Sequence, residues 1–298
     1  MDVGLSTQRP TTTDGPRRSA PEREHRHRGP ARPGRTFSGP VVERRRLVSA
    51  LARAVDEAVV TLVCAPAGSG KTVLVSCWAD GARDPVGWLT VTSRDDDPHV
   101  FWRHVRSALS DAGALSARPR SELVLGGDDV DLLACRLPRT GSPVVLVLDA
   151  VERIGRQEIF DGLAALVDRT HGLLRLVLAT REDPPLPLHR YRLDGTLAEL
   201  SPTELALTPA ELHALLEAYG VRLPAGSVAT LVDRTEGWVA GARMAALALR
   251  PGATGTTLER SASDYLAVEV LAPLPEAERD LLLRVSILDE VSPGSRRP

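Results

Sequence analysis

Residues 59–72 read Val-Val-Thr-Leu-Val-Cys-Ala-Pro-Ala-Gly-Ser-Gly-Lys-Thr, an apolar run of strand length followed by a glycine-containing loop and the start of a helical stretch. The glycines of such a loop let backbone N–H groups turn inward around phosphate oxygens, and the helix N-terminus adds partial positive charge. Lys71 would reach the β and γ oxygens of a nucleoside triphosphate, and the Thr72 hydroxyl would bind Mg²⁺. We therefore predict a phosphate-binding P-loop whose nucleotide-binding residues are Ala65, Pro66, Ala67, Gly68, Ser69, Gly70, Lys71, Thr72 and Val73.

Lys71 is the only lysine in the chain, and every other Lys or Arg position is arginine. A compact ammonium on a flexible stem reaches between phosphates in a way that a planar guanidinium does not. Ala65 stands where the first glycine of the loop is usual, at a position that needs only a small side chain. A chance match in a glycine-rich turn is the alternative, and it would require a strand, a loop, a helix and a single lysine to coincide.

Apolar runs of strand length alternate with amphipathic stretches from Val41 to about Leu200, which is the pattern of a parallel sheet covered by helices on both faces. We expect an α/β fold with a doubly wound, mainly parallel sheet of five strands. The predicted strands are Val59–Cys64, Val86–Val91, Val144–Leu148, Leu174–Ala179 and Thr196–Leu200. The predicted helices between them are Gly70–Trp78, His99–Leu109 and Ile159–Val167, of which the second follows the capping acids at 95–97.

The domain organisation follows from changes in composition along the chain. Residues 1–37 are rich in Arg and Pro and poor in large apolar side chains, so we expect a disordered tail there. We expect a nucleotide-binding domain over 38–201, a small all-helical lid domain over 202–256, and the start of a truncated winged-helix-like domain over 257–298. The expected helices after residue 201 begin at Pro209 behind a Thr208 cap, at Ser227, at Trp238, at Asp264 and at Pro275.

Asp149 ends the apolar run Val144–Leu148 and is the candidate carboxylate for holding Mg²⁺ together with Thr72. A charged residue that merely marks the edge of the sheet is the alternative. The next residue is Ala150, where many hydrolysing P-loop proteins carry a second acid that polarises the attacking water. Glu152 is a candidate for replacing that acid, or a solvated glutamate at the start of a helix.

Arg181 follows the strand Leu174–Ala179 and therefore lies at the carboxyl edge of the sheet, where ligands bind in open α/β folds. It is a candidate for contacting the γ-phosphate. A surface pairing with Glu182 or Asp183 is the alternative.

Bulk composition excludes several classes of protein. A net charge of −2 and few aromatic residues give no case for a dedicated nucleic-acid binder, although arginines of the N-terminal tail could touch phosphates. The three cysteines have no paired spacing, and no apolar stretch is long enough to cross a bilayer. We expect a cytoplasmic protein that does not enter the membrane.

The ordered set of motifs resembles the ATPase module of the MalT-like and large LuxR-type transcriptional regulators, in the STAND class of P-loop NTPases with an AAA-like core. The matching stretches, besides the P-loop, are Val86–Val91, Asp97–Trp102, Leu146–Asp149, Leu178–Leu188, Glu236–Gly241 and Asp264–Leu271. The resemblance runs from about residue 38 to the end of the chain.

That resemblance implies ADP held at rest, exchange for ATP when an inducer or partner protein binds, and self-association of the ATP form. It places Val41 and Val42 against the adenine, makes Arg181 a sensor arginine, and turns Trp238 toward the nucleotide. Full-length relatives continue to a DNA-reading helix-turn-helix that has no room after Leu271, so we expect no direct sequence-specific DNA binding from this chain.

The sequence thus favours a nucleotide-dependent molecular switch that binds Mg-ATP or Mg-ADP and hydrolyses ATP slowly, if at all. Asp149, Glu152 and Arg181 are the candidates for any catalytic step. Two alternatives stay open at this point. One is a metabolic P-loop enzyme, such as a small-molecule kinase or ATPase, and the other is a decayed fragment with an intact loop.

Overall fold

The computed structural model of the chain describes residues 1, 39–115, 129–137, 143–250, 267, 271–272 and 274–286. The predicted disordered tail therefore lies outside the described residues apart from Met1, as does the expected helix that begins at Asp264, apart from residues 267 and 271. The domain boundaries stay predictions.

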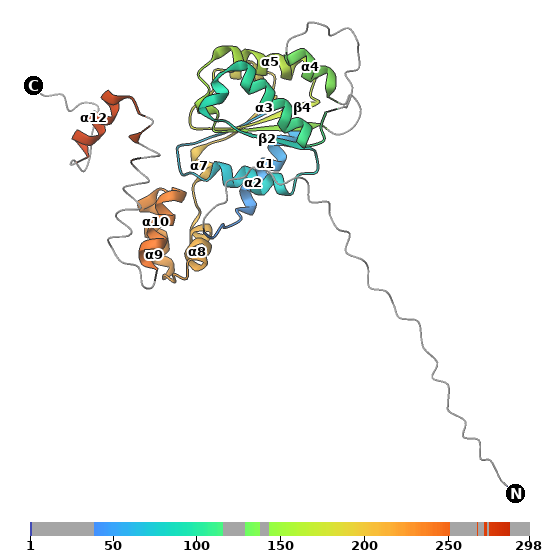
Figure 1. The fold of residues 1–298 in the computed structure, drawn as a ribbon. Helices are drawn as coiled ribbons and strands as arrows, with labels where there is room; N and C mark the ends of the chain where they lie inside the picture. Colours follow the sequence, from blue (N-terminus) through green and yellow to red (C-terminus); the bar gives the residue numbers. More distant parts are fainter. Residues whose placement is uncertain are drawn as a thin grey trace, which may run out of the picture.

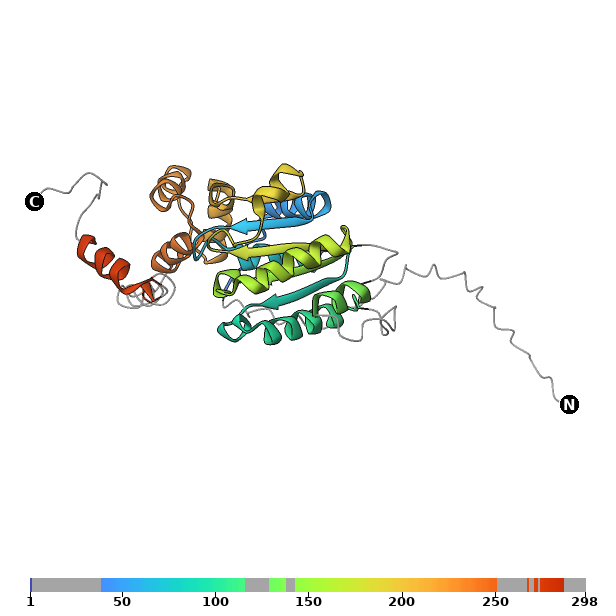
Figure 2. The ribbon, with the colours of Figure 1, turned by 90° about the horizontal axis from the view of Figure 1, so that it is seen from above.

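The predicted α/β fold is confirmed. Five strands form one sheet in the order β2-β3-β4-β1-β5, and every neighbouring pair is parallel (Figures 1 and 2). The strands are β1 (Val60–Cys64), β2 (Val86–Thr90), β3 (Val144–Asp149), β4 (Leu174–Thr180) and β5 (Leu197–Leu200). All five agree with the predicted strands to within one residue at each end.

Helices cover both faces of this sheet because the buried strands are apolar on both sides. Alternate residues of β3 point to opposite faces, so Leu146 and Leu148 join one apolar core while Val145 and Val147 join the other. The first core lies under α3 (Pro98–Asp111), α4 (Asp129–Arg136), α5 (Gln157–Thr170) and α6 (Leu188–Leu193). The second lies under α1 (Arg45–Glu57) and α2 (Lys71–Asp80).

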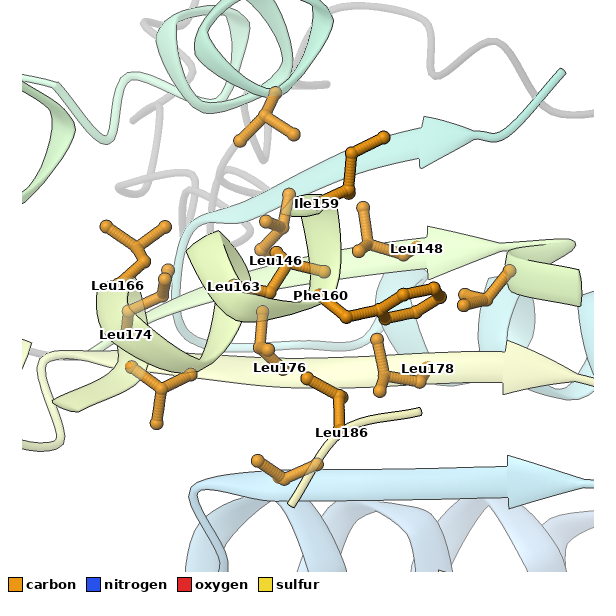
Figure 3. Close-up of a cluster of buried hydrophobic side chains, with 14 of the residues drawn as sticks. Leu146, Leu148, Ile159, Phe160, Leu163, Leu166, Leu174, Leu176, Leu178 and Leu186 are labelled. Atoms are coloured by element: carbon orange, nitrogen blue, oxygen red, sulfur yellow. The ribbon is translucent and has the colours of Figure 1, made fainter. Parts of the chain in front are cut away.

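The core beneath α5 shows how closely the helix and the sheet are packed (Figure 3). Phe160 and Leu163 of α5 point onto Leu146 and Leu148 of β3 and onto leucines of β4, and all of these side chains are at most 1% exposed. Interiors of this density tolerate little change in volume. The ends of β3 and β4, which carry the candidate site residues, are therefore held on a rigid base.

Sequence reasoning missed four helices, namely α1, α4, α6 and α7 (Pro202–Leu205). The signal for α1 was present, since Leu47, Leu51 and Val55 recur every four residues and form its buried face. The chain there begins with four consecutive charged residues, and their polarity obscured the apolar stripe. The other three helices have eight residues or fewer, too short for a reliable period.

A separate group of helices follows the sheet. It contains α8 (Pro209–Ala218), α9 (Ala225–Thr235) and α10 (Val239–Leu249), which share an apolar cluster of their own (Figure 1). The predicted cap of α8 is confirmed. The Glu211 carboxylate accepts from the Thr208 N–H at 3.0 Å, and Thr208 Oγ1 accepts from the Glu211 N–H at 3.2 Å.

Helix α12 (Glu276–Val285) falls within the predicted stretch Pro275–Leu288 and buries none of its side chains. Within the described part of the chain, no helix combines the length and the apolar character needed to span a membrane.

Candidate functional site

The candidate site lies at the carboxyl edge of the sheet, where β1, β3 and β4 end side by side. In the parallel register Cys64 of β1 is opposite Thr180 of β4, and Asp149 of β3 is opposite Ala179. The loop after β1 turns back over this edge and enters α2 at Lys71. Gly68 (φ 75°) and Gly70 (φ 84°) adopt the left-handed conformation, which only glycine takes without strain. The residues predicted to bind phosphate therefore form a strand, loop and helix as expected.

Lys71 is folded back onto its own loop. Its ammonium donates hydrogen bonds to the carbonyl oxygens of Ala65 (2.5 Å) and Pro66 (3.0 Å). Burial lowers the pKa of Lys71 below its ordinary value, and the Glu152 carboxylate acts in the opposite direction with a smaller effect. The lysine is thus a partly desolvated cation close to the acidic end of β3.

Thr72 and Asp149, 77 residues apart in sequence, are brought into direct contact. The Thr72 hydroxyl donates to Asp149 Oδ1 at 3.0 Å, with Oδ2 at 3.2 Å. Asp149 is the last residue of β3 and only 5% exposed, and its role as the metal-binding carboxylate stays a prediction. A hydroxyl and a carboxylate are the hard oxygen donors that Mg²⁺ prefers.

The segment after β3, which contains Ala150 and Glu152, differs from the sequence interpretation. Ala150 has φ 64°, a left-handed conformation that is uncommon for a residue with a Cβ, and it opens the short 3₁₀ helix η2 (Val151–Arg153). This turn directs Glu152 inward, where its side chain is only 16% exposed and its Oε1 pairs with Arg181 Nε at 2.9 Å. The solvated glutamate considered above is therefore wrong, and Arg181 has a partner that was not foreseen.

The helical segment touches the P-loop backbone directly. Trp238 Nε1 donates to the Ala67 carbonyl at 2.8 Å, and the Ala240 N–H donates to the Gly68 carbonyl at 3.0 Å. Trp238 and Ala240 lie at the start of α10, so this helix is tied to the same loop that is predicted to hold phosphate. The family resemblance predicts that Trp238 faces the nucleotide, and this stays a prediction; in this structure its indole donates to the P-loop backbone.

Two cavities adjoin the loop. One is apolar and is lined by the segment before α1, by α2 and by the helical segment, including Val41, Val42, Val73, Leu207 and Val239. The other lies over the loop and is lined by Ser69, Glu152, Arg181, Gly237 and Trp238, among others. The apolar cavity therefore lies beside α2, and the cavity that contains the charged side chains lies over the loop.

Arg44 is a site residue that sequence reasoning missed. Its guanidinium, in a residue only 9% exposed, donates to the carbonyl oxygens of Leu205 (2.7 Å) and Ala206 (2.9 Å) and pairs with Glu211 at 3.4 Å. Arg44 also lines the apolar cavity. Three consecutive arginines occur at 44–46, and composition offers no signal that singles out the buried one.

The sheet order, the parallel strands and the Gly-Lys-Thr loop between β1 and α2 define the chain as a P-loop ATPase fold. A Walker-type ATPase of Pyrococcus abyssi superposes on it with a TM-score of 0.50 and 13% identity, over 83% of this chain and 77% of that one. No family model matches the chain.

Sequence comparison gives the relatives. The chain is 30% identical to the serine/threonine-protein kinase PknK of Mycobacterium tuberculosis. The alignment has 317 positions and covers 93% of this chain and 28% of PknK. The chain is also 29% identical to the HTH-type transcriptional regulator MalT of Serratia proteamaculans. That alignment has 265 positions and covers 83% of this chain and 29% of MalT. The chain is thus a homologue of MalT-like regulators and of PknK, similar to a nucleotide-binding ATPase module, and it spans less than a third of the length of these relatives.

Proposed function

We propose that this chain is a nucleotide-dependent molecular switch that binds Mg-ATP and Mg-ADP. The observation that carries the proposal is the joining of three parts at one sheet edge. These are a P-loop with a partly buried Lys71, a Thr72–Asp149 pair, and a helical segment hydrogen-bonded to the carbonyls of that loop.

The residues present fit a magnesium nucleotide. Thr72 Oγ1 and Asp149, already 3.0 Å apart, offer the oxygen ligands for Mg²⁺, and Lys71 supplies the cation for phosphate oxygens. The apolar cavity next to α2 offers a surface for the base, with Val41 and Val42 in its lining. When bound, the magnesium ion would neutralise phosphate charge, and the protein groups would hold the nucleotide in place.

The output of the switch is conformational. Because Trp238 and Ala240 bond to Ala67 and Gly68, a ligand that reorganises the loop alters contacts on which the position of α10 depends. Ala150 lacks the acid that polarises an attacking water, which supports slow or absent hydrolysis. The relatives named as transcriptional regulators support a regulatory role, with self-association of the ATP form as part of that role.

Thermal unfolding with and without Mg-ATP or Mg-ADP tests the proposal. A ligand that binds only the native state stabilises it by about 2.7 kcal/mol at a hundred times its Kd, so the midpoint should rise for the parent chain. Lys71→Ala should abolish the rise. Arg83→Ala is the matched control, because it removes one positive charge from an exposed residue just beyond α2.

A cooperative melt that neither nucleotide shifts would contradict the proposal. So would an equal shift for the parent and for Lys71→Ala, since nucleotide would then bind elsewhere on the chain.

A further inference from the structure

The Glu152–Arg181 ion pair lies inside the cavity over the P-loop. The two side chains are 16% and 29% exposed, and their charged atoms are 2.9 Å apart. Both residues line this cavity together with Ser69 of the loop. A partly buried ion pair is screened less than a fully exposed one, so its charges act on any anion that enters the cavity.

Glu152 keeps one acceptor unused. Its Oε1 is held by Arg181, whereas Oε2 is buried and has no hydrogen-bond partner among the described residues. A buried carboxylate oxygen without a donor is costly and is normally explained by a functional arrangement. The Glu152 carboxylate also acts electrostatically on Lys71, so it lies within range of the predicted phosphate site.

Four charged side chains interact closely around the loop before any ligand binds. Lys71 and Arg181 contribute two positive charges, and Asp149 and Glu152 contribute two negative ones. In a P-loop the lysine contacts the β- and γ-phosphates, so a third phosphate extends past Lys71 toward the ends of β3 and β4. Asp149, Glu152 and Arg181 lie there. The third phosphate therefore enters a space where a carboxylate already holds the arginine.

We infer that Glu152 is an internal competitor of the terminal phosphate for Arg181, and that it thereby sets the preference of the site between triphosphate and diphosphate. The inference rests on the proposed nucleotide binding. ADP ends at the β-phosphate and leaves the ion pair intact, whereas ATP must separate Arg181 from Glu152 and bring a like charge close to that carboxylate. The ion pair thus favours binding of the diphosphate over binding of the triphosphate.

The backbone turn at Ala150 provides the geometry for this competition. Its left-handed conformation reverses the chain directly after Asp149, so η2 presents Glu152 toward the loop and not toward solvent. Asp149, the candidate metal ligand, ends β3, and Glu152 follows three residues later in the lining of the cavity over the loop.

The test measures binding of Mg-ADP and of the hydrolysis-resistant analogue Mg-AMPPCP by isothermal titration calorimetry. Glu152→Gln keeps the size of the side chain and removes its charge. We expect the affinity for Mg-AMPPCP to rise about tenfold, equivalent to about 1.4 kcal/mol, with less than a twofold change for Mg-ADP. Glu182→Gln is the matched control, because Glu182 is an exposed carboxylate that lines the same cavity. It should leave the ratio of the two affinities unchanged.

A second pair of variants shows that Arg181 mediates the effect. In the Arg181→Met background, Glu152→Gln should change the ratio less than it does in the parent chain, because the competition for Arg181 is gone and only the repulsion between Glu152 and the terminal phosphate is relieved. The inference is overturned if Glu152→Gln strengthens both ligands equally, if it weakens Mg-AMPPCP, or if Glu182→Gln has the same effect. A parent chain that binds neither ligand overturns the proposed function as well, which distinguishes that failure from the others.

Discussion

Gly237 is the position where a single methyl group should do most harm to the junction between the sheet and the helical segment. Its φ of 68° lies in the left-handed region, and a Cβ built there would be 2.7 Å from the Leu207 nitrogen and 3.0 Å from the Leu207 oxygen. The Gly237 carbonyl also accepts from the Leu207 N–H at 2.8 Å. Gly237→Ala therefore strains one backbone segment and pushes against another that cannot move without losing this hydrogen bond.

The magnitude follows from a matched variant. Gly220 has φ 75° and nothing within 4 Å of its would-be Cβ, so Gly220→Ala isolates the conformational cost. That cost is about 1–2 kcal/mol, partly offset by about 0.4–1 kcal/mol from the stiffer unfolded chain. Overpacking against fixed atoms adds about 1–3 kcal/mol at Gly237 alone. We expect Gly237→Ala to lower the free energy of unfolding by about 2 kcal/mol more than Gly220→Ala does.

Urea unfolding followed by tryptophan fluorescence provides the assay, because Trp238 is adjacent to Gly237 and the other three tryptophans are buried in the cores of the sheet. Gly237→Ala should also weaken the nucleotide-induced rise in melting temperature, since the Trp238–Ala67 hydrogen bond depends on the same turn. Equal destabilisation by the two variants would refute the steric reasoning, because the left-handed conformation is common to both positions.

Two further predictions concern buried charges. Arg44→Met should destabilise the chain by about 3 kcal/mol in urea unfolding, because the carbonyls of Leu205 and Ala206 lose their donor and Glu211 loses a cation; a loss below about 1 kcal/mol would contradict this. Asp95→Asn tests pH dependence: burial raises the pKa of Asp95, but hydrogen bonds from Thr92 and His104 outweigh it and leave the pKa below its ordinary value. The stabilisation is therefore complete above about pH 4 and is lost as pH falls through the folded-state pKa. Below about pH 4, the plot of unfolding free energy against pH should be flatter for Asp95→Asn than for the parent chain. Parallel plots for the two proteins would contradict a lowered pKa of Asp95.

Local sequence signals were sufficient for the sheet and the loop. The strands were predicted to within a residue because runs such as Val144–Leu148 are apolar on both faces, which is characteristic of buried parallel strands. The contact between Thr72 and Asp149 was also foreseeable, since a loop after one strand and an acid ending another must meet at the same edge. The missed helix α1 shows the limit, because a charged beginning concealed its regular apolar stripe.

Glu152, Arg44 and Trp238 depended on information that no local pattern contains. The sequence left Glu152 open between a replacement for the second acid and a solvated glutamate. Its inward direction follows from the left-handed turn at Ala150, and alanine carries no sequence signal for that conformation. Arg44 is one of three adjacent arginines, and only its distance from Leu205, 161 residues away in sequence, makes it a buried anchor.

The division between the two sources of information has a physical basis. The fold class and the phosphate-binding loop were predictable from patterns among neighbouring residues. These patterns are the spacing of apolar residues, the glycines of the loop and the position of the single lysine. The partners of Glu152, Arg44 and Trp238 come from elements far apart in sequence. Which charge pairs with which depends on burial and on distances of a few ångströms, because Coulomb interactions and hydrogen bonds weaken steeply with separation. Only the packed tertiary structure determines those distances.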